Sequence, residues 1–208
     1  MSTSSRPKPL RADAARNRER VLDAAHKCFA EHGVDAQMDD IAAAAGVGVG
    51  TVYRHFSTKE ALLEGLTFDY FEAQCEVARR AAEAEDPWEG FTAYLREGAE
   101  IMASSRGLAE VVSDRPDVMQ AAALAADTRH GLFAIIEGMI GRAQATGALR
   151  ADFELEDIPM IMCSIGSLHA TGKGGGWRRL LEVVIDGLRS PGSAELPPHG
   201  ERLIPRST

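Results

Sequence analysis

The chain has 208 residues, which is enough for one or two domains with a buried core. Its composition, with 45% hydrophobic and 26% charged residues, excludes collagen-like, mucin-like and wholly disordered chains. The formal net charge of −8 argues against polyanion binding by the whole surface, so any contact with nucleic acid must be local.

The three cysteines, Cys28, Cys75 and Cys163, are far apart and form no Cys-x-x-Cys pair. This spacing predicts neither a disulfide framework nor a structural zinc site, and a reducing cytoplasm is the expected compartment. No apolar stretch follows residues 1–10 that could form the core of a signal peptide. The most apolar stretch, 158–170, is much shorter than the roughly 20 residues that span a bilayer. The sequence therefore predicts no export by that route and no membrane span.

Basic side chains gather at the start of the chain. Residues 1–20 carry six basic and two acidic side chains, whereas residues 61–208 carry 14 basic and 23 acidic ones. We interpret residues 1–13 as a flexible basic arm. A solvated tail accounts for the same charges, and contact with nucleic acid is favoured only if a DNA-binding module follows directly.

Helical periodicity runs through most of the chain, and no segment alternates convincingly with a period of two, so an all-α fold of about nine helices is predicted. In the first helix, for example, Val21, Ala24, Cys28 and Phe29 fall on one face. The predicted helices cover residues 14–31, 38–45, 48–56, 58–84, 87–104, 108–112, 117–146, 155–169 and 177–188. Residues 190–208, which are rich in Pro and Gly, are predicted to be disordered.

Two short helices around a single glycine form a helix-turn-helix pattern in residues 38–56. Ile41, Ala45 and Val52 can meet as a small core between the two helices. Gly46 lies at the sharp turn, where a left-handed backbone suits glycine because glycine has no Cβ. An ordinary corner between two helices would show the same pattern.

The side chains that follow the turn favour a DNA-binding function. Polar and basic groups that bind phosphates and base edges occur at Thr51, Tyr53, Arg54, His55 and Lys59. The segment reads Ile-Ala, Ala-Gly-Val, Gly-Thr-Val-Tyr-Arg-His-Phe, Lys and Leu at the spacing typical of the TetR family of bacterial transcriptional repressors, and it resembles that family over about residues 14–64.

The resemblance implies an N-terminal helix-turn-helix domain, residues 14–60, that binds double-stranded operator DNA. It implies phosphate contacts by Thr51, Tyr53, His55 and Lys59 and base reading by Arg54. The predicted DNA-binding residues are Gln37, Gly48, Val49, Gly50, Thr51, Tyr53, Arg54, His55 and Lys59. Gln37 and Gly48 depart from the Thr and Ser usual there, which removes two hydroxyls that would cap a helix or touch a phosphate. A helix-end role for His55, bonded to a carbonyl, is the alternative at that position.

Residues 61–189 resemble the effector-binding and dimerisation domain of the SbtR-like subgroup, with Trp88, 106–110 and 177–180 carrying the likeness. The resemblance implies a homodimer in which the last two helices of each copy pair. The predicted interface comprises Leu155, Ile158, Met162, Ile165, Gly166, Leu168, Trp177, Leu181, Val184, Ile185 and Leu188. A core confined to one copy would account for the same apolar residues.

The resemblance also implies a central cavity for a small-molecule effector. The predicted cavity residues are Trp88, Phe91, Tyr94, Leu95, Met102, Val111, Met119, Phe133, Ile136 and Cys163. Polar groups that can fix a ligand are Tyr94, Arg129, His130 and His169. Simple core packing is the alternative for each aromatic residue and methionine.

We therefore expect a cytoplasmic repressor of the TetR type, which binds a palindromic operator as a homodimer and is released by a small, largely apolar effector, without cofactor or metal. An activator and a regulator controlled by a partner protein are the alternatives. An enzyme is disfavoured because Cys163 and His169, six residues apart on one helix, point to different faces. The glycines at 174–176 also lack the order of a phosphate-binding loop.

Overall fold

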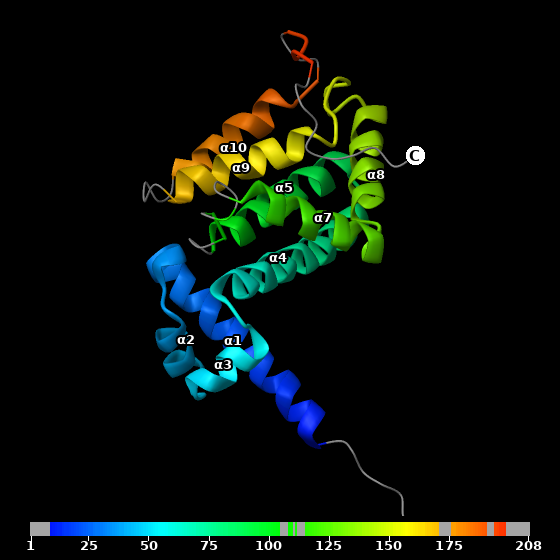
Figure 1. The fold of residues 1–208 in the computed structure, drawn as a ribbon. Coiled ribbons are helices and arrows are strands. Elements are labelled where there is room, and N and C mark those ends of the chain that lie inside the picture. The colour runs from blue at the N-terminus through cyan, green and yellow to red at the C-terminus, as the bar shows by residue number, and fades with distance from the viewer. Residues whose placement is uncertain are drawn as a thin grey trace, which may run out of the picture.

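The computed structural model describes residues 9–104, 108–109, 111, 115–170, 176–190 and 194–198, and their arrangement is shown in Figure 1. The elements in chain order are α1 (Pro9–His32), the short 3₁₀ helix η1 (Gly33–Asp35), α2 (Met38–Ala45), α3 (Val49–His55), α4 (Lys59–Ala82), α5 (Pro87–Ala103), α7 (Pro116–His130), α8 (Leu132–Ala145), α9 (Asp157–Ala170) and α10 (Gly176–Gly187).

The predicted all-α class is confirmed, since the described part of the chain shows no β-structure beyond a single bridge between Leu149 and Arg189. Helix α1 begins at Pro9, earlier than the expected start at Ala14. Of the predicted helix at 108–112, residues 108, 109 and 111 are described and are helical, whereas residues 110 and 112 lie outside the described part of the chain. None of the helices in the described ranges combines the length and apolar content that a bilayer crossing requires.

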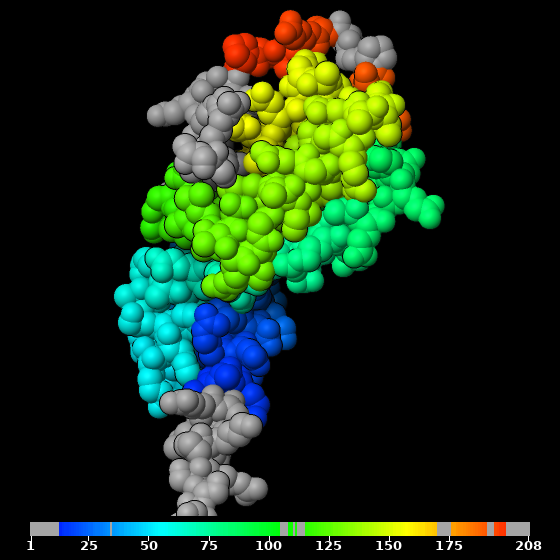
Figure 2. Space-filling view, turned by 90° about the vertical axis from the view of Figure 1, so that its right-hand side faces the viewer, coloured from blue at the N-terminus to red at the C-terminus, as the bar shows by residue number. Residues whose placement is uncertain are grey.

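The molecule consists of two lobes that share helix α4. Helices α1 to α3 form the N-terminal lobe, and the later helices form the larger C-terminal body (Figures 1 and 2). Leu62 and Leu66, in the first half of α4, belong to the core of the N-terminal lobe, whereas Tyr70 and Val77 belong to the core of the C-terminal body. One helix therefore connects the two parts of the molecule.

The core of the N-terminal lobe contains the apolar residues of α2 and α3 that the sequence predicts to meet. Ile41 and Val52 have exposed fractions of 0%, and Ala42 and Ala45 are buried beside them. The chain turns at Gly46, which has a φ of 62°. This core confirms the helix-turn-helix that the spacing of residues 38–56 predicts.

Arg20 of α1 fastens this turn to the first helix. Its Nη2 donates hydrogen bonds to the carbonyl oxygens of Ala45, at 2.6 Å, and of Gly46, at 3.3 Å. A Cβ added to Gly46 would lie 2.9 Å from the same nitrogen. The backbone angle therefore favours glycine at this position, and a Cβ there would in addition displace the end of the Arg20 side chain.

We expect Gly46→Ala to lower the free energy of unfolding by about 1–2 kcal/mol, because alanine is strained in the left-handed region. Gly50→Ala is the matched control. A Cβ on Gly50 would have no neighbour within 4 Å. Alanine is more stable than glycine in a helix by up to about 1 kcal/mol, so this variant should not lose stability. Urea unfolding measures both variants, and equal losses of stability would contradict the role assigned to Gly46.

The single helix predicted over residues 117–146 is wrong, because the chain breaks into α7 and α8 at Gly131. Gly131 has a φ of 65°, and Oδ1 of Asp127 accepts a hydrogen bond from the backbone N–H of Phe133 at 2.9 Å, in the first turn of α8. Both helices pack against α4. The spacing of apolar residues therefore continues from α7 into α8. A single glycine within such a pattern is only a weak indication that the helix ends there.

The described part of the predicted tail, residues 194–198, lies against the loop that follows α8. Asp152 accepts a hydrogen bond from the backbone N–H of Leu196 at 2.8 Å, and Arg150 donates to Asp152 and to the carbonyl oxygen of Ala194. The Arg150 guanidinium, followed by the Leu196 N–H, holds the pKa of the Asp152 carboxyl well below its usual value. The carboxylate that anchors this stretch is therefore ionised at neutral pH.

Candidate DNA-binding face and effector cavity

Helix α3 presents polar side chains on the surface of the N-terminal lobe. Tyr53 is 49% exposed, and Val49 and Arg54 are also exposed. Neither the Tyr53 nor the Arg54 side chain forms a hydrogen bond or ion pair with another of the described residues. This face is free to meet a partner.

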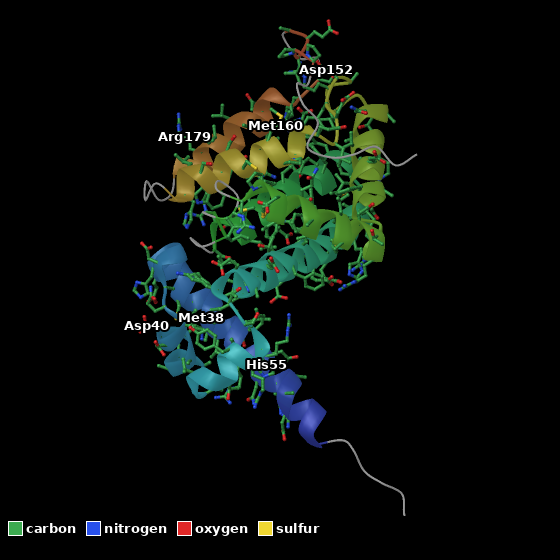
Figure 3. All side chains as sticks on the ribbon, in the orientation of Figure 1. Met38, Asp40, His55, Asp152, Met160 and Arg179 are labelled. Carbon is green, nitrogen blue, oxygen red and sulfur yellow. The ribbon has the colours of Figure 1, made fainter. Side chains whose placement is uncertain are left out.

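Three further predicted DNA contacts, Thr51, His55 and Lys59, are half-buried at the edge of the same face. His55 lies at the C-terminal end of α3 (Figure 3), and its buried Nε2 has no hydrogen-bond partner within the described part of the chain. At Nε2, therefore, His55 does not form the hydrogen bond to a carbonyl oxygen that the alternative interpretation requires.

The two departures from the family pattern leave α2 and α3 without side-chain caps. Gln37 precedes α2, but its Nε2 donates to the carbonyl oxygen of Asp35 at 2.6 Å. Gly48 precedes α3 and has no side chain to offer. A Cβ on Gly48 or Gly50 would have no neighbour within 4 Å, so packing inside the protein does not require glycine at either position.

A cavity of about 560 Å³ lies in the C-terminal body among α4, α5, α7, α8 and α9. The predicted cavity residues that line it are Tyr94, Met102, Met119, Phe133, Ile136 and Cys163. Most of the wall is apolar, as predicted.

The cavity has a buried end and an exposed mouth. Tyr70, Gln74 and Tyr94, on α4 and α5, have exposed fractions of 5%, 2% and 3%. Asp117 and Gln120, in the first turns of α7, are exposed. Polar groups therefore occur at both ends of a largely apolar space.

The buried end holds neutral groups. Burial raises the pKa of the Tyr70 and Tyr94 phenols and of the Cys163 thiol, so all three stay protonated at neutral pH. At the mouth, Oδ2 of Asp117 lies 3.0 Å from Nη2 of Arg115. The charge on that carboxylate is therefore paired.

Sequence comparison assigns both lobes to one family. Residues 21–66 match the model of bacterial regulatory proteins of the tetR family, and residues 86–190 match that of the SbtR-like transcriptional regulator C-terminal domain. The crystal structure of a TetR transcription regulatory protein from Mycobacterium vanbaalenii is similar with 37% identity and a TM-score of 0.58, covering 87% of this chain and 99% of that one. The chain belongs to the TetR family.

Other proteins that the chain is similar to are transcriptional regulators as well. A TetR transcriptional regulator from Streptomyces coelicolor is 28% identical, with a TM-score of 0.55, over 85% of this chain and 99% of its own. An HTH-type transcriptional regulator from Staphylococcus aureus (strain USA300) is 48% identical over 54 residues, which are 26% of this chain and only 29% of that regulator. FadR from Bacillus subtilis, solved in complex with stearoyl-CoA, shares the fold at 20% identity, with a TM-score of 0.62, over 83% of this chain and 97% of its own. The chain is thus a DNA-binding transcriptional regulator.

Four residues predicted for the effector cavity of this TetR-family protein lie outside its wall: Trp88, Phe91, Leu95 and Val111. All four are buried elsewhere in the core. Phe91 packs edge-on against Phe153 with ring centroids 5.4 Å apart, and the Arg189 guanidinium lies 4.7 Å from the centre of a Trp88 ring. The cavity borders only the stripe of α5 that carries Tyr94 and Met102, because the helix also packs on its other sides.

Sequence reasoning missed the contribution of α4 to the cavity. Tyr70, Phe71 and Gln74 all line it. The sequence does contain an indication of this contribution, because Gln74 is a polar residue on an otherwise apolar helix face, one turn after Tyr70. Arg129 and His130 instead bind Glu72, with distances of 3.2 Å from Arg129 Nη1 to Oε1 and 2.9 Å from His130 Nε2 to Oε2.

The residues predicted for the TetR-type dimer interface lie mainly inside the protomer. Leu155, Ile158 and Met162 line the cavity. Five more of the predicted interface residues are buried in the core, with exposed fractions of 1–7%: Ile165, Trp177, Leu181, Ile185 and Leu188. Gly166 is also buried, and a Cβ there would lie 3.5 Å from the sulfur of Met102, while Leu168 and Val184 are half-buried. His169 lies outside the cavity wall, and its buried Nδ1 has no partner among the described atoms.

Helices α9 and α10 also expose apolar side chains on their outer face. Met160 (Figure 3), Leu180 and Val183 have exposed fractions of 52%, 37% and 60%. Met160 and Leu180 border a shallow groove between the two helices, and the predicted interface residues Ile165, Leu181, Val184 and Leu188 also line it. The two helices are thus apolar both toward the protomer core and toward this outer face.

Proposed function

We propose that this regulator is a repressor that binds a palindromic operator as a homodimer and leaves it when a small, largely apolar molecule fills the cavity. One observation carries the proposal. The same chain has an unpaired, exposed α3 face with Tyr53 and Arg54 and a separate cavity of about 560 Å³, and both are joined to helix α4.

The face of α3 supports DNA binding by a short recognition helix. Arg54 is the residue that reads a base, because its guanidinium is exposed, unpaired and suited to a bidentate contact in the major groove. Thr51, Tyr53 and Lys59 border it and contact phosphates. One such helix reads only a few base pairs, so a specific operator requires two copies.

The outer face of α9 and α10 supports the homodimer. Met160, Leu180 and Val183 are large apolar side chains exposed on neighbouring helices, and such a patch is typical of a protein interface. We assign the contact with the second copy to these residues, together with the predicted interface residues that line the groove beside them: Ile165, Leu181, Val184 and Leu188.

The mouth of the cavity supports control of DNA binding by an effector. Asp117 lies at the mouth and pairs with Arg115. The Asp117 hydrogen bond raises the pKa of the Arg115 guanidinium, and the charges of Glu64 and Glu60 contribute less. These two glutamates lie in the first turns of α4, directly after α3. Helix α7 also packs against α4, which directly follows α3. A molecule that displaces the start of α7 is therefore expected to shift α4 and, with it, the DNA-binding helix α3.

A nuclease footprint on the DNA upstream of the protein's own gene tests this proposal. We expect protection of a near-palindrome whose half-sites are separated by about 34–36 Å or a multiple of it, because each copy places one α3 in the major groove. Mobility-shift assays on the same DNA, with candidate effectors added, measure release. Protection of one asymmetric half-site would contradict the dimer, and tighter DNA binding with effector would contradict release.

A further inference from the structure

One polar side chain in the cavity wall has an unused hydrogen-bonding atom. Gln74 lines the cavity and is 2% exposed. Its Nε2 donates to the carbonyl oxygen of Gly98 at 3.2 Å, but its buried Oε1 has no partner in the described part of the chain. A buried acceptor without a donor is unfavourable, so this atom calls for an explanation.

The packing of α5 fixes the orientation of this amide. Because a carbonyl oxygen only accepts hydrogen bonds, the Gly98 oxygen must face the NH₂ group of Gln74, which leaves Oε1 as the free atom. A Cβ at position 98 would lie 2.9 Å from Oε1 and 3.1 Å from Nε2. Glycine at this position therefore makes room for the Gln74 amide against α5.

The surroundings of Gln74 are neutral and largely apolar, apart from the Tyr70 phenol, whose pKa burial raises and the Gln74 side chain lowers to a smaller extent. Tyr70, Tyr94 and Cys163 are the other polar residues at the buried end, and burial keeps all three protonated. The charged residue among the described cavity-lining residues is Asp117, which is exposed at the mouth and paired with Arg115. The buried end thus offers the free Oε1 acceptor and two phenol hydroxyls, but no charge.

We infer that the effector is a neutral, largely apolar molecule with a hydroxyl group that donates a hydrogen bond to Oε1 of Gln74. A carboxylate cannot donate this bond and would be repelled by the same oxygen. An ammonium group can donate it but would lose its hydration in an apolar space where no buried carboxylate compensates. This inference rests on the proposed role of the cavity as the effector site.

Four probes with the same ten-carbon chain test the inference by calorimetric titration of the full-length protein without DNA. The probes are decan-1-ol, decyl methyl ether, decanoate and decylammonium. We expect decan-1-ol to bind at least about tenfold more tightly than the ether, because the ether accepts hydrogen bonds but donates none. Decanoate and decylammonium should bind more weakly than the alcohol.

Two variants assign the preference to Gln74. Gln74→Met keeps a similar length but removes the carbonyl oxygen, so the preference for the alcohol over the ether should disappear. Met119→Leu changes another cavity residue without altering a polar group, and it should keep the preference. The comparison of probes on the unmodified protein remains decisive even if Gln74→Met fails to fold.

Three results would overturn the inference: equal binding of alcohol and ether, tighter binding of decanoate than of decan-1-ol, or no saturable binding of any probe. Release of operator DNA is measured separately by mobility shift. Gln74-dependent binding of decan-1-ol without release would refute the proposed repressor mechanism but support the inference. Release by decanoate that Gln74→Met leaves unchanged would support the mechanism and refute the inference.

Discussion

Arg54→Ala will weaken binding to the cognate operator by about 1–3 kcal/mol per half-site, which for two half-sites is about 30-fold to more than 10⁴-fold. The reason is that the Arg54 guanidinium is exposed on α3 without a partner in the described part of the protein, so a base edge in the major groove is free to bind it. Fluorescence anisotropy with operators changed at single base pairs measures the loss. Preference should relax at one position of each half-site.

Lys59→Ala is the matched control for this variant. Lys59 is half-buried at the start of α4, and we propose that its ammonium contacts a phosphate. Its loss should weaken binding to all sequences alike and lower the salt slope by about one per half-site. If Arg54→Ala weakened binding to cognate and scrambled DNA equally, Arg54 would be a phosphate contact and its assignment as the base reader would be wrong.

Filling the cavity with Ala123→Phe should abolish the response to an effector while the protein still binds its operator. Ala123 of α7 lines the cavity, and a phenyl group there would occupy the space needed by the ligand. In the unmodified protein, operator DNA should weaken binding of decan-1-ol by about 5- to 150-fold, the same factor by which decan-1-ol weakens operator binding. In the variant this factor should fall to about 1, so that operator DNA no longer changes the affinity for decan-1-ol; titrations with and without operator measure it.

Ala125→Phe provides the comparison. Ala125 is on the same helix, exposed and outside the cavity wall, so its replacement adds the same group without blocking the ligand. This variant should keep both operator binding and the response. A full response by Ala123→Phe, or an equal loss in both variants, would show that release does not depend on occupation of this cavity.

The helix-turn-helix could be predicted from the sequence because short-range rules determine it. The spacing of Ile41, Ala45 and Val52 fixes which side chains meet, and the left-handed backbone at Gly46 follows from the sharp turn between two adjacent helices. The contact of Arg20 with the carbonyl oxygens of Ala45 and Gly46 could not be predicted in this way, because it joins residues 25 and 26 positions apart.

The cavity and the outer helix faces were harder to predict, because they depend on how helices pack in three dimensions. Phe91 and Tyr94 are neighbours on one apolar helix, yet Tyr94 lines the cavity and Phe91 packs on Phe153. Helix α9 is apolar on opposite sides, with Met160 exposed and Met162 in the cavity wall. Hydrophobic periodicity identifies such faces but does not show which neighbour each of them meets.

The sharing of helix α4 by the two cores has a consequence for how the molecule loses its structure. Leu62 and Leu66, with exposed fractions of 0% and 1%, complete the core of the N-terminal lobe, although they lie beyond a boundary drawn after residue 60. A fragment truncated at that boundary would lack two of the side chains that fill its own interior. Melting of either lobe exposes part of the same helix, so the two lobes are expected to unfold as one cooperative unit rather than in separate steps.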